Sequence, residues 1–325
     1  MKEFFKVKTI DQVLEYRTQF APMETEKVPI ADSMNRILAQ DIHADIDLPD
    51  FSRSIMDGFA VRGASTFGAS EGNPAYLVVK GTVAMGESPN LSVGPGEAVR
   101  ISTGGMLPPG ADSVVMVEHT GAIDDDTIEV YRSVAPGQNM VTVGEDIKKG
   151  EAMLIAGLNI RPQEVGLLAA LGRPEVAVYK RPVVGIISTG DEIVPISEIP
   201  GPGQIRDVNT YTLMSQVREL GALAVPFGIV GDDYETLLAK SARAFERCDL
   251  VLVSGGSSVG ARDFTIDVIS AMEDAAILFH GISISPGKPT ILARVQNKQF
   301  WGLPGHVVSA MIVFSRIVKP FIEYV

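Results

Sequence analysis

The hydrophobic and polar positions change their spacing along the chain, and the second half has the simpler pattern. From Arg181 onward, short apolar runs alternate with segments in which apolar residues recur every three or four positions. The runs predict buried strands at 182–188, 222–230, 249–254, 290–295 and 299–303. The periodic segments predict helices at 209–220, 233–248, 264–272 and 307–324. This alternation indicates an α/β three-layer domain, in which helices cover both faces of a mostly parallel sheet.

Polar residues at the ends of these segments predict where two of the helices begin and stop. Asn209 stands at the start of 209–220 and Gly221 directly follows it, which is the usual order of an N-terminal cap and a C-terminal glycine. Either Asp232 or Asp233 is expected to cap the next helix, because both precede its first apolar residue.

The first half of the chain has a different pattern. Thr9 and Gln12 have the spacing of a capping box and predict a helix over 9–20. From about Tyr76 to Val143, short β segments are separated by Gly- and Pro-rich turns, which indicates an antiparallel β domain. We therefore expect a multidomain chain with a discontinuous N-terminal linker domain at 1–45 and 141–180, an inserted β-rich domain at 46–140 and an α/β domain at 181–325.

Composition excludes several classes of protein. The formal net charge is -12, whereas a general nucleic-acid surface needs a basic stripe, so no nucleic-acid partner is expected. No apolar stretch approaches the roughly 20 residues that span a bilayer, and the N-terminus lacks the apolar core of a signal peptide, so no membrane association is expected. The single cysteine, Cys248, excludes an internal disulfide and a thiolate metal cluster. Together these features predict a cytoplasmic protein.

Residues that can bind a ligand gather where the predicted strands end. After the strand 249–254 come Gly255, Gly256 and Ser258, and a helix begins near Asp263. Glycine lets a backbone N–H approach an anion closely, serine adds a hydroxyl donor, and the helix N-terminus favours negative charge. The alternative is a tight turn that Asp263 caps.

Further polar loops fall at the same expected edge of the sheet, at 188–194, 201–210, 231–233, 285–291 and 302–310. Each loop alone fits a capped turn. Because the loops gather at one edge, they indicate a pocket for a phosphorylated ligand and an oxygen-liganded cation such as Mg²⁺. The chain contains neither a P-loop nor a G-x-G-x-x-G motif, and its histidines lack the spacing of zinc ligands.

An ordered set of motifs resembles one protein family. The motifs are "DLPDFSRSIMDGFAVRG", "ISTGGMLPPGADSVVMVE", "GEDIKKGEAML", "ISTGDEIV", "GQIRDVNTYTL", "SGGSSVGARDFT", "SPGKP" and "GLPGHVVSA". They occur in the order found in the MoeA-type molybdopterin molybdenumtransferases, a family that includes the gephyrin E domain. The resemblance runs from about residue 9 to the end of the chain.

The resemblance implies a fold, a reaction and partners. The linker domain is expected to be elongated, and the α/β domain to resemble the molybdopterin adenylyltransferases. The reaction implied is Mg²⁺-dependent insertion of molybdate into adenylylated molybdopterin, with release of AMP. A homodimer is implied, in which the inserted domain of one subunit faces the α/β domain of the other, so that the pockets are shared between subunits. A second implied partner is the enzyme that delivers adenylyl-molybdopterin.

The resemblance also assigns roles to residues by position. The catalytic positions that it implies are Asp57, Glu192, Asp232, Asp263 and Lys288. The implied metal positions are Asp57, Asp146, Glu192, Asp232 and Asp263. The implied ligand-binding positions, together with those of the glycine-rich loop, are Ser54, Thr103, Ser188, Thr189, Asp207, Asn209, Gly255, Gly256, Ser258, Pro304 and Gly305.

The chain departs from the family pattern in two places. Ser285 stands where the family usually has the first lysine of "KPGKP", and His306 and Val307 stand where "NP" or "YP" is usual. The family normally continues into a small C-terminal β domain, and we expect that domain to be absent after Val325. Two alternatives to the transferase stay open: an enzyme like the molybdopterin adenylyltransferases, and a non-enzymatic scaffold such as gephyrin.

Overall fold

The contacts within the chain divide it into two compact units. The computed structural model describes residues 7–255 and 264–325. The α/β unit consists of Met1–Ala39, Asn159–Val165 and Pro174–Val325, and the inserted unit consists of Gln40–Leu158 and Gly166–Arg173. The residues of the expected linker domain are shared between these units, and the three-part division stays a prediction.

A six-stranded sheet forms the centre of the α/β unit. In spatial order its strands are β16 (Leu223–Val230), β13 (Val183–Thr189), β17 (Leu250–Ser254), β20 (Lys298–Leu303), β19 (Ile291–Val295) and β18 (Ala275–His280). The first four are parallel, and β19 and β18 are antiparallel. The predicted mostly parallel sheet is therefore present, with β18 as an additional edge strand that the pattern did not predict.

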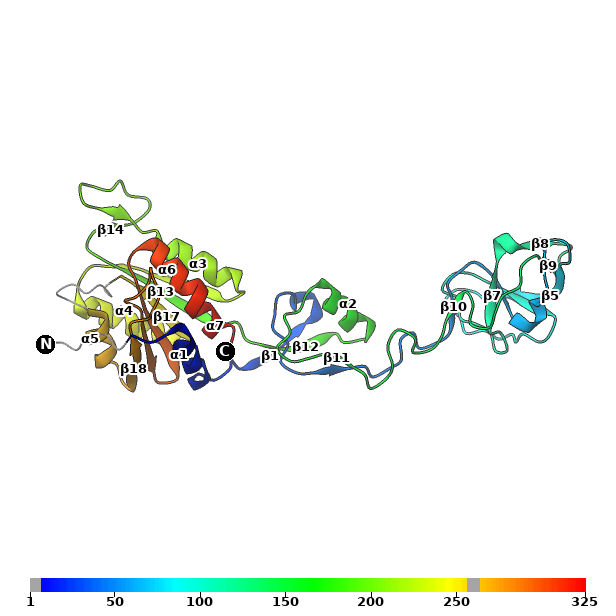
Figure 1. Cartoon of the computed structure of the whole chain (residues 1–325), viewed down its shortest axis with the longest axis horizontal. Coiled ribbons are helices and arrows are strands. Elements are labelled where there is room, and N and C mark those ends of the chain that lie inside the picture. Colours follow the sequence, from blue (N-terminus) through cyan, green and yellow to red (C-terminus); the bar gives the residue numbers. More distant parts are fainter. Residues whose placement is uncertain (1–6, 256–263) are drawn as a thin grey trace. The chain divides into compact units, whose positions relative to one another are not determined.

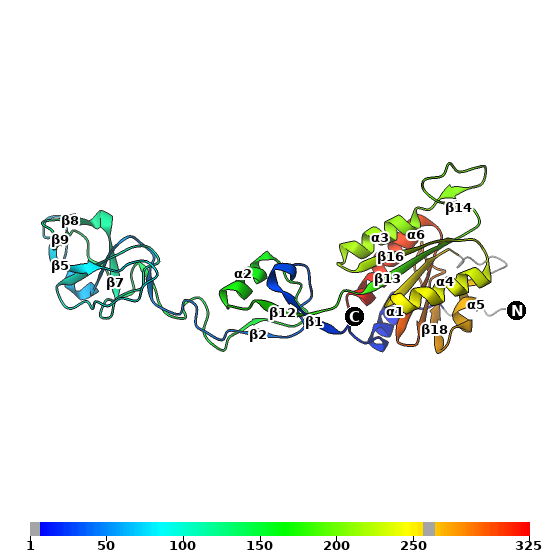
Figure 2. The same ribbon diagram turned by 180° about the vertical axis from the view of Figure 1, so that it is seen from behind.

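Helices cover both faces of this sheet (Figures 1 and 2). One face carries α1 (Ile10–Glu15), α3 (Asn209–Glu219), α6 (Val307–Val313) and α7 (Lys319–Ile322). The other face carries α4 (Tyr234–Arg247) and α5 (Phe264–Ala271). Alternate residues of the central strands enter the two hydrophobic cores, as Ile186 and Ile187 of β13 do. The predicted three layers are confirmed.

The ends of the helices follow the sequence signals with one exception. Thr9 and Gln12 form the predicted capping box of α1, and Asp233 caps α4 by accepting from the N–H of Thr236. The prediction that Asn209 caps α3 is wrong, because its side chain bonds elsewhere. The cap position is Val208, which gives α3 no side-chain cap.

Two predicted helices are interrupted. A 3₁₀ turn at Tyr16–Gln19 follows α1, and a π-helical turn at Phe314–Val318 separates α6 from α7.

Smaller strand pairs complete the α/β unit: β1 (Thr25–Pro29) with β12 (Glu175–Tyr179), and β14 (Ile193–Val194) with β15 (Ile205–Arg206). Along the described ranges, no helix is long and apolar enough to cross a membrane.

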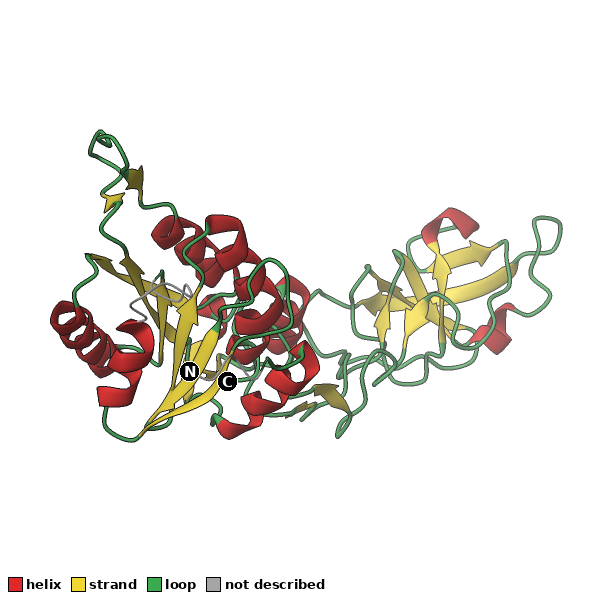
Figure 3. Ribbon diagram, turned by 60° about the vertical axis from the view of Figure 1, so that its left-hand side comes forward, coloured by secondary structure: helices red, strands yellow, loops and turns green. Residues whose placement is uncertain are grey.

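The inserted unit contains a second six-stranded sheet (Figure 3). In spatial order its strands are β7 (Ser113–Met116), β4 (Gly58–Val61), β6 (Glu97–Ile101), β5 (Ala75–Thr82), β9 (Thr127–Val130) and β8 (Thr120–Ala122). All neighbours are antiparallel except β5 and β6, which are parallel. The expectation of a purely antiparallel domain is therefore corrected at this one pair.

The two segments that bracket this sheet run side by side. Short antiparallel pairs join β2 (Ile42–His43) to β11 (Ala152–Leu154), and β3 (Arg53–Ser54) to β10 (Met140–Val141). The helix α2 (Pro162–Ala170) follows the returning segment. The β-rich part is thus an insertion whose entry and exit are paired.

Candidate functional site

The predicted loops of the α/β unit lie at one edge of its sheet. The parallel strands β13, β16, β17 and β20 all end there. Because β19 is antiparallel to β20, its first residue Ile291 pairs with Gly302 near the end of β20. The loop between β18 and β19 therefore reaches the same edge, which is where ligands bind in open α/β sheets.

Gly255 has a conformation and surroundings that only glycine satisfies. Its φ is +106°, and a Cβ atom there would lie 2.2 Å from the carbonyl oxygen of Thr189. Its N–H donates to the carbonyl of Leu303 at 3.1 Å. The chain can leave β17 only by passing closely over the ends of β13 and β20. Three further predicted residues, Gly256, Ser258 and Asp263, lie outside the described residues.

A buried hydrogen-bond network lies at this edge around Ser188. The Ser188 hydroxyl donates to Asp207 Oδ1 at 2.9 Å, and lies 2.9 Å from the Thr210 hydroxyl and 3.3 Å from that of Ser254. Asp207 Oδ1 also accepts from the N–H of Thr210 at 3.1 Å, which fixes the start of α3. These side chains are buried, and Thr189 is only 4% exposed. The network therefore links the end of β13 to the end of β17 and the start of α3. Contact of Ser188, Thr189 and Asp207 with a ligand stays a prediction.

Asn209 links the start of α3 to the turn before α6. Its Nδ2 donates to the carbonyl of Gly305 at 2.8 Å, and its Oδ1 is buried without a hydrogen-bond partner. Pro304 is buried and Gly305 is exposed at the turn itself. This arrangement explains why Asn209 is not a helix cap: its amide holds the two loops together.

The exposed acids at this edge come from two neighbouring strands. Glu192 follows β13 and Asp232 follows β16. Partial desolvation raises the pKa of Asp232, and the negative charges of Asp191 and Glu192 raise it further. Within the described residues, no group of three His, Cys, Asp or Glu side chains is arranged to hold a metal ion. Metal binding by Glu192 and Asp232 therefore stays a prediction.

Asp191 was not predicted as a site residue. Its Oδ1 accepts a hydrogen bond of 2.9 Å from the N–H of Asp232, so it joins the loop after β13 to the loop after β16. The motif "STGDE" contained the signal, because a second acid stood beside Glu192 at the end of a buried strand.

Lys288 is exposed in the loop that returns to the edge at β19. Its carbonyl accepts from the N–H groups of Ile282 and Thr290 at 3.0 and 2.9 Å, which closes the turn. Gly287 has a φ of +121°, and a Cβ there would lie 2.5 Å from the side chain of Val313 in α6. The backbone of this loop is thus tied down while the Lys288 ammonium faces solvent.

The inserted unit brings together the residues predicted from "SRSIMDG" and "ISTGG". Asp57 Oδ1 accepts from the N–H of Thr103 at 2.8 Å, and both residues are exposed. Ser54 is buried, and its hydroxyl exchanges hydrogen bonds with the backbone of Met56. Gly58 completes the motif, because a Cβ there would lie 1.9 Å from the carbonyl oxygen of Val115 in β7. Ser54 and Gly58 therefore shape the turn that presents Asp57.

Asp146 lies apart from this cluster within the inserted unit. Its N–H donates to the carbonyl of Leu48 at 3.0 Å, on the paired segments that lead to the sheet. Its side chain is exposed. The structure brings Asp57 and Thr103 together but not Asp146 with them, and the metal role of Asp146 stays a prediction.

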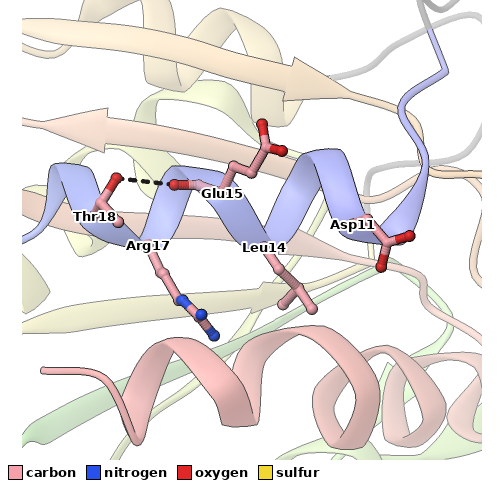
Figure 4. A pocket seen from close by; sticks show the side chains of 5 residues that line it. All are labelled: Asp11, Leu14, Glu15, Arg17 and Thr18. Carbon is pink, nitrogen blue, oxygen red and sulfur yellow. Dashed lines mark hydrogen bonds between the residues drawn. The ribbon is translucent and has the colours of Figure 1, made fainter.

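A shallow depression along α1 and the 3₁₀ turn that follows it lies outside the predicted site (Figure 4). It is lined by Asp11, Leu14, Glu15, Arg17 and Thr18. Figure 4 shows Leu14 and Arg17 pointing towards a C-terminal helix, and the Arg17 guanidinium lies 5.7 Å from the ring centroid of Tyr324. None of the predicted site residues lines this depression.

Two family models match the chain one after the other. Residues 8–172 match the model described as "MoeA N-terminal region (domain I and II)". Residues 185–324 match the model described as "Probable molybdopterin binding domain". The two matches together cover both units.

Relatives and a solved structure agree with these models. The molybdopterin molybdenumtransferase of Bacillus subtilis is 37% identical over 303 residues, which are 92% of this chain and 70% of that protein. The enzyme of the same name from Haemophilus influenzae is 37% identical over 301 residues, 93% of this chain and 73% of that protein. A crystal structure of the molybdopterin biosynthesis MoeA protein from Pyrococcus horikoshii superposes with a TM-score of 0.86 at 38% identity, covering 98% of this chain and 80% of that one. The chain therefore belongs to the MoeA family of molybdopterin molybdenumtransferases, enzymes of molybdenum cofactor biosynthesis.

Proposed function

We propose that this protein inserts molybdate into adenylylated molybdopterin and releases AMP, with Mg²⁺ as the required cation. The observation that carries the proposal is the consecutive match of both family models across the two units. A stand-alone adenylyltransferase would need only the α/β part, so the match over residues 8–172 favours the transferase over that alternative.

The donor groups at the sheet edge fit a hard cation. Mg²⁺ prefers carboxylate oxygens, and Glu192 and Asp232 supply them from adjacent loops. Asp263 would add a third carboxylate. Bound there, Mg²⁺ would neutralise the pyrophosphate of the substrate and polarise its phosphorus. Mg²⁺ bound beside Asp232 would stabilise the ionised carboxylate, which partial desolvation disfavours in the cation-free protein.

The remaining loops would hold the phosphorylated part of the substrate. Exposed Lys288 offers a charge-assisted hydrogen bond to a phosphate oxygen. The buried Ser188 network would keep these loops in place when the ligand arrives. The chain has no need of a cysteine for molybdenum, because the sulfurs of the pterin would hold the metal.

The inserted unit would act on a second copy of the chain. We place Asp57 and Thr103 of one subunit opposite the acidic edge of another, in a homodimer with shared pockets. Asp57 has one carboxylate oxygen engaged by Thr103, so its geometry is fixed while the other oxygen can contact a ligand. The substrate would come from an enzyme that adenylylates molybdopterin, and the reaction would take place in the cytoplasm.

The test is incubation of the purified protein with adenylylated molybdopterin, molybdate and Mg²⁺. AMP is measured by chromatography, and the metal-loaded pterin by activation of a molybdenum-free acceptor enzyme. Both products are expected to appear together, and EDTA is expected to abolish them. Formation of adenylyl-molybdopterin from molybdopterin and ATP would identify the adenylyltransferase instead. Absence of both activities would favour the third alternative, a non-enzymatic scaffold.

A mixed-dimer experiment tests the shared pocket. Chains carrying Asp57→Ala and chains carrying Asp232→Ala are each expected to be inactive. In a mixed dimer, one pocket keeps both acids, so mixing should restore up to about a quarter of the wild-type activity per chain if the subunits exchange freely. No recovery in a mixture that contains heterodimers by mass spectrometry would refute the shared pocket.

A further inference from the structure

The loop that carries Asp232 is fixed on both sides. On its N-terminal side, the backbone N–H of Asp232 donates to Asp191 Oδ1 at 2.9 Å. On its C-terminal side, Asp233 caps α4 by accepting from Thr236 at 2.8 Å. Between them the loop makes a sharp turn, in which the N–H of Asp233 donates to the carbonyl of Gly231 at 2.7 Å. Asp232 therefore has little freedom as long as both flanking side chains hold.

Asp191 is itself well placed to hold the turn. Its loop is joined to β16, because the N–H of Gly190 donates to the carbonyl of Val230 at 3.0 Å. The packing against the turn is tight, since a Cβ at Gly231 would lie 2.9 Å from Asp191 Oδ1. A side chain at position 231 would therefore displace the carboxylate that positions Asp232.

We infer that Asp191 is a positioning residue, which holds the Gly231–Asp233 turn through its Oδ1 atom so that the Asp232 carboxylate faces the same edge as Glu192. The inference rests on the proposed function only in its use of Asp232 as a cation ligand. Position 191 therefore needs a short side chain with an oxygen acceptor, and does not need a negative charge.

This requirement separates two roles that an acid could have. If Asp191 bound the cation directly, asparagine would be a poor substitute, because it lacks the charge. If Asp191 only positions the turn, asparagine keeps the carbonyl acceptor at the same distance from the backbone and replaces it well. Alanine removes the acceptor in either case.

The experiment compares Asp191→Asn, Asp191→Ala and Glu235→Ala with the wild type. Glu235→Ala is the matched control, because it removes an exposed negative charge from the first turn of α4 without touching the turn at 231–233. Binding of Mn²⁺, as a spectroscopic substitute for Mg²⁺, is measured by electron paramagnetic resonance on the protein alone. AMP release gives kcat and KM, and thermal unfolding reports whether each variant is folded.

Positioning predicts a clear order of variants. Asp191→Asn and Glu235→Ala should bind Mn²⁺ within about threefold of the wild type. Asp191→Ala should bind about tenfold or more weakly and lose kcat with little change in KM, because the N–H of Asp232 loses its acceptor and the turn is no longer held. Its melting temperature should stay close to that of Asp191→Asn.

Two outcomes would overturn the inference. Equal loss of Mn²⁺ affinity in Asp191→Asn and Asp191→Ala would show that the charge matters and the acceptor does not. Wild-type affinity in Asp191→Ala would show that the turn holds without Asp191. If the wild type binds Mn²⁺ but releases no AMP, the proposed function fails while the order of affinities still decides the role of Asp191. If the wild type binds no Mn²⁺, both fail.

Discussion

The carboxylate of Asp57 and the backbone N–H of Thr103 form a 2.8 Å hydrogen bond between two neighbouring turns of the inserted unit. Asp57 belongs to the turn before β4, and Thr103 to the turn after β6, which pairs with β4. The bond therefore fixes the direction of an exposed carboxylate that sits on a rigid sheet. Asparagine at position 57 can keep the acceptor while removing the charge, which separates the structural contribution of this side chain from its chemistry.

Asp57→Asn is accordingly expected to fold normally and to be inactive. Its melting temperature should lie within a few degrees of the wild type, whereas AMP release should fall by about a hundredfold or more, as for loss of a group that stabilises the transition state. Asp57→Ala should be both inactive and less stable by about 1 kcal/mol, because the N–H of Thr103 loses its partner. Activity in Asp57→Asn close to wild type would mean that the carboxylate serves the turn alone.

Gly58→Ala is expected to destabilise the inserted unit. The added Cβ would overlap the carbonyl of Val115, and β4 lies between two strands, so neither neighbour can move away freely. We expect a loss of about 3 kcal/mol, at the upper end for overpacking in a core, measured by urea unfolding followed in this unit. Gly72→Ala is the control, since a Cβ there meets no atom within 4 Å. Similar stability of the two variants would contradict the tight approach of β4 and β7.

The raised pKa of Asp232 predicts a pH dependence of stability and of cation binding. A carboxyl whose pKa is higher in the folded than in the unfolded protein destabilises the fold when it is ionised, and this cost disappears as pH falls below the unfolded value. Asp232→Asn should therefore raise the melting temperature slightly at pH 7 and lose that advantage near pH 4. Cation affinity of the wild type should decline on acidification at a higher pH than that of an ordinary aspartate. Scanning calorimetry and Mn²⁺ titration over pH 4–8 measure both effects, and a lower melting temperature of the variant at pH 7 would reverse the sign.

Lys298→Met is expected to destabilise the α/β unit through the C-terminus of α4. The Lys298 ammonium donates to the carbonyls of Phe245 and Cys248 at 2.7 and 2.9 Å, where the helix leaves its last carbonyl groups unpaired. Methionine keeps the length of the side chain but cannot donate, so a loss of about 1–3 kcal/mol is expected in urea unfolding. Lys319→Met removes only an exposed pair with Glu323 and should cost less than about 1 kcal/mol. Equal effects of the two substitutions would exclude the capping role.

The sequence was sufficient for the α/β layers because the hydrophobic spacing of each element is regular there. The runs at β13, β17 and β20 are buried on both faces and read as continuous apolar segments. The edge strand β18 was missed although Ala275–Phe279 is an apolar run, because a short apolar run that follows a helical pattern cannot be assigned to a strand by periodicity alone. The parallel pairing of β5 with β6 could not be predicted, because pairing direction depends on how the loop between them travels and not on local pattern.

The sequence predicted where the candidate site lies, but not which of its side chains are buried and hydrogen-bonded. The gathering of loops at one edge follows from strand direction alone, so Glu192, Asp232 and Lys288 could be placed there from the sequence. Side-chain burial was not foreseeable in the same way. Ser188 lies near the end of β13 and Asn209 begins α3, and their side chains bond across the fold to Asp207 and Gly305. Such long-range hydrogen bonds leave no local pattern in the sequence.

The paired entry and exit of the inserted unit have a consequence for how this protein can be rebuilt. The N–H of Ala44 donates to the carbonyl of Glu151 at 3.0 Å, and the N–H of Gly150 donates to the carbonyl of Ala44 at 2.8 Å. These positions already have the geometry of neighbours across a β-hairpin, so an Asn-Gly dipeptide could join them without moving either strand. The β-rich segment is in this sense a detachable cassette. It can be removed, or exchanged for the corresponding segment of a relative, at the positions where the entering and leaving segments already form backbone hydrogen bonds with each other.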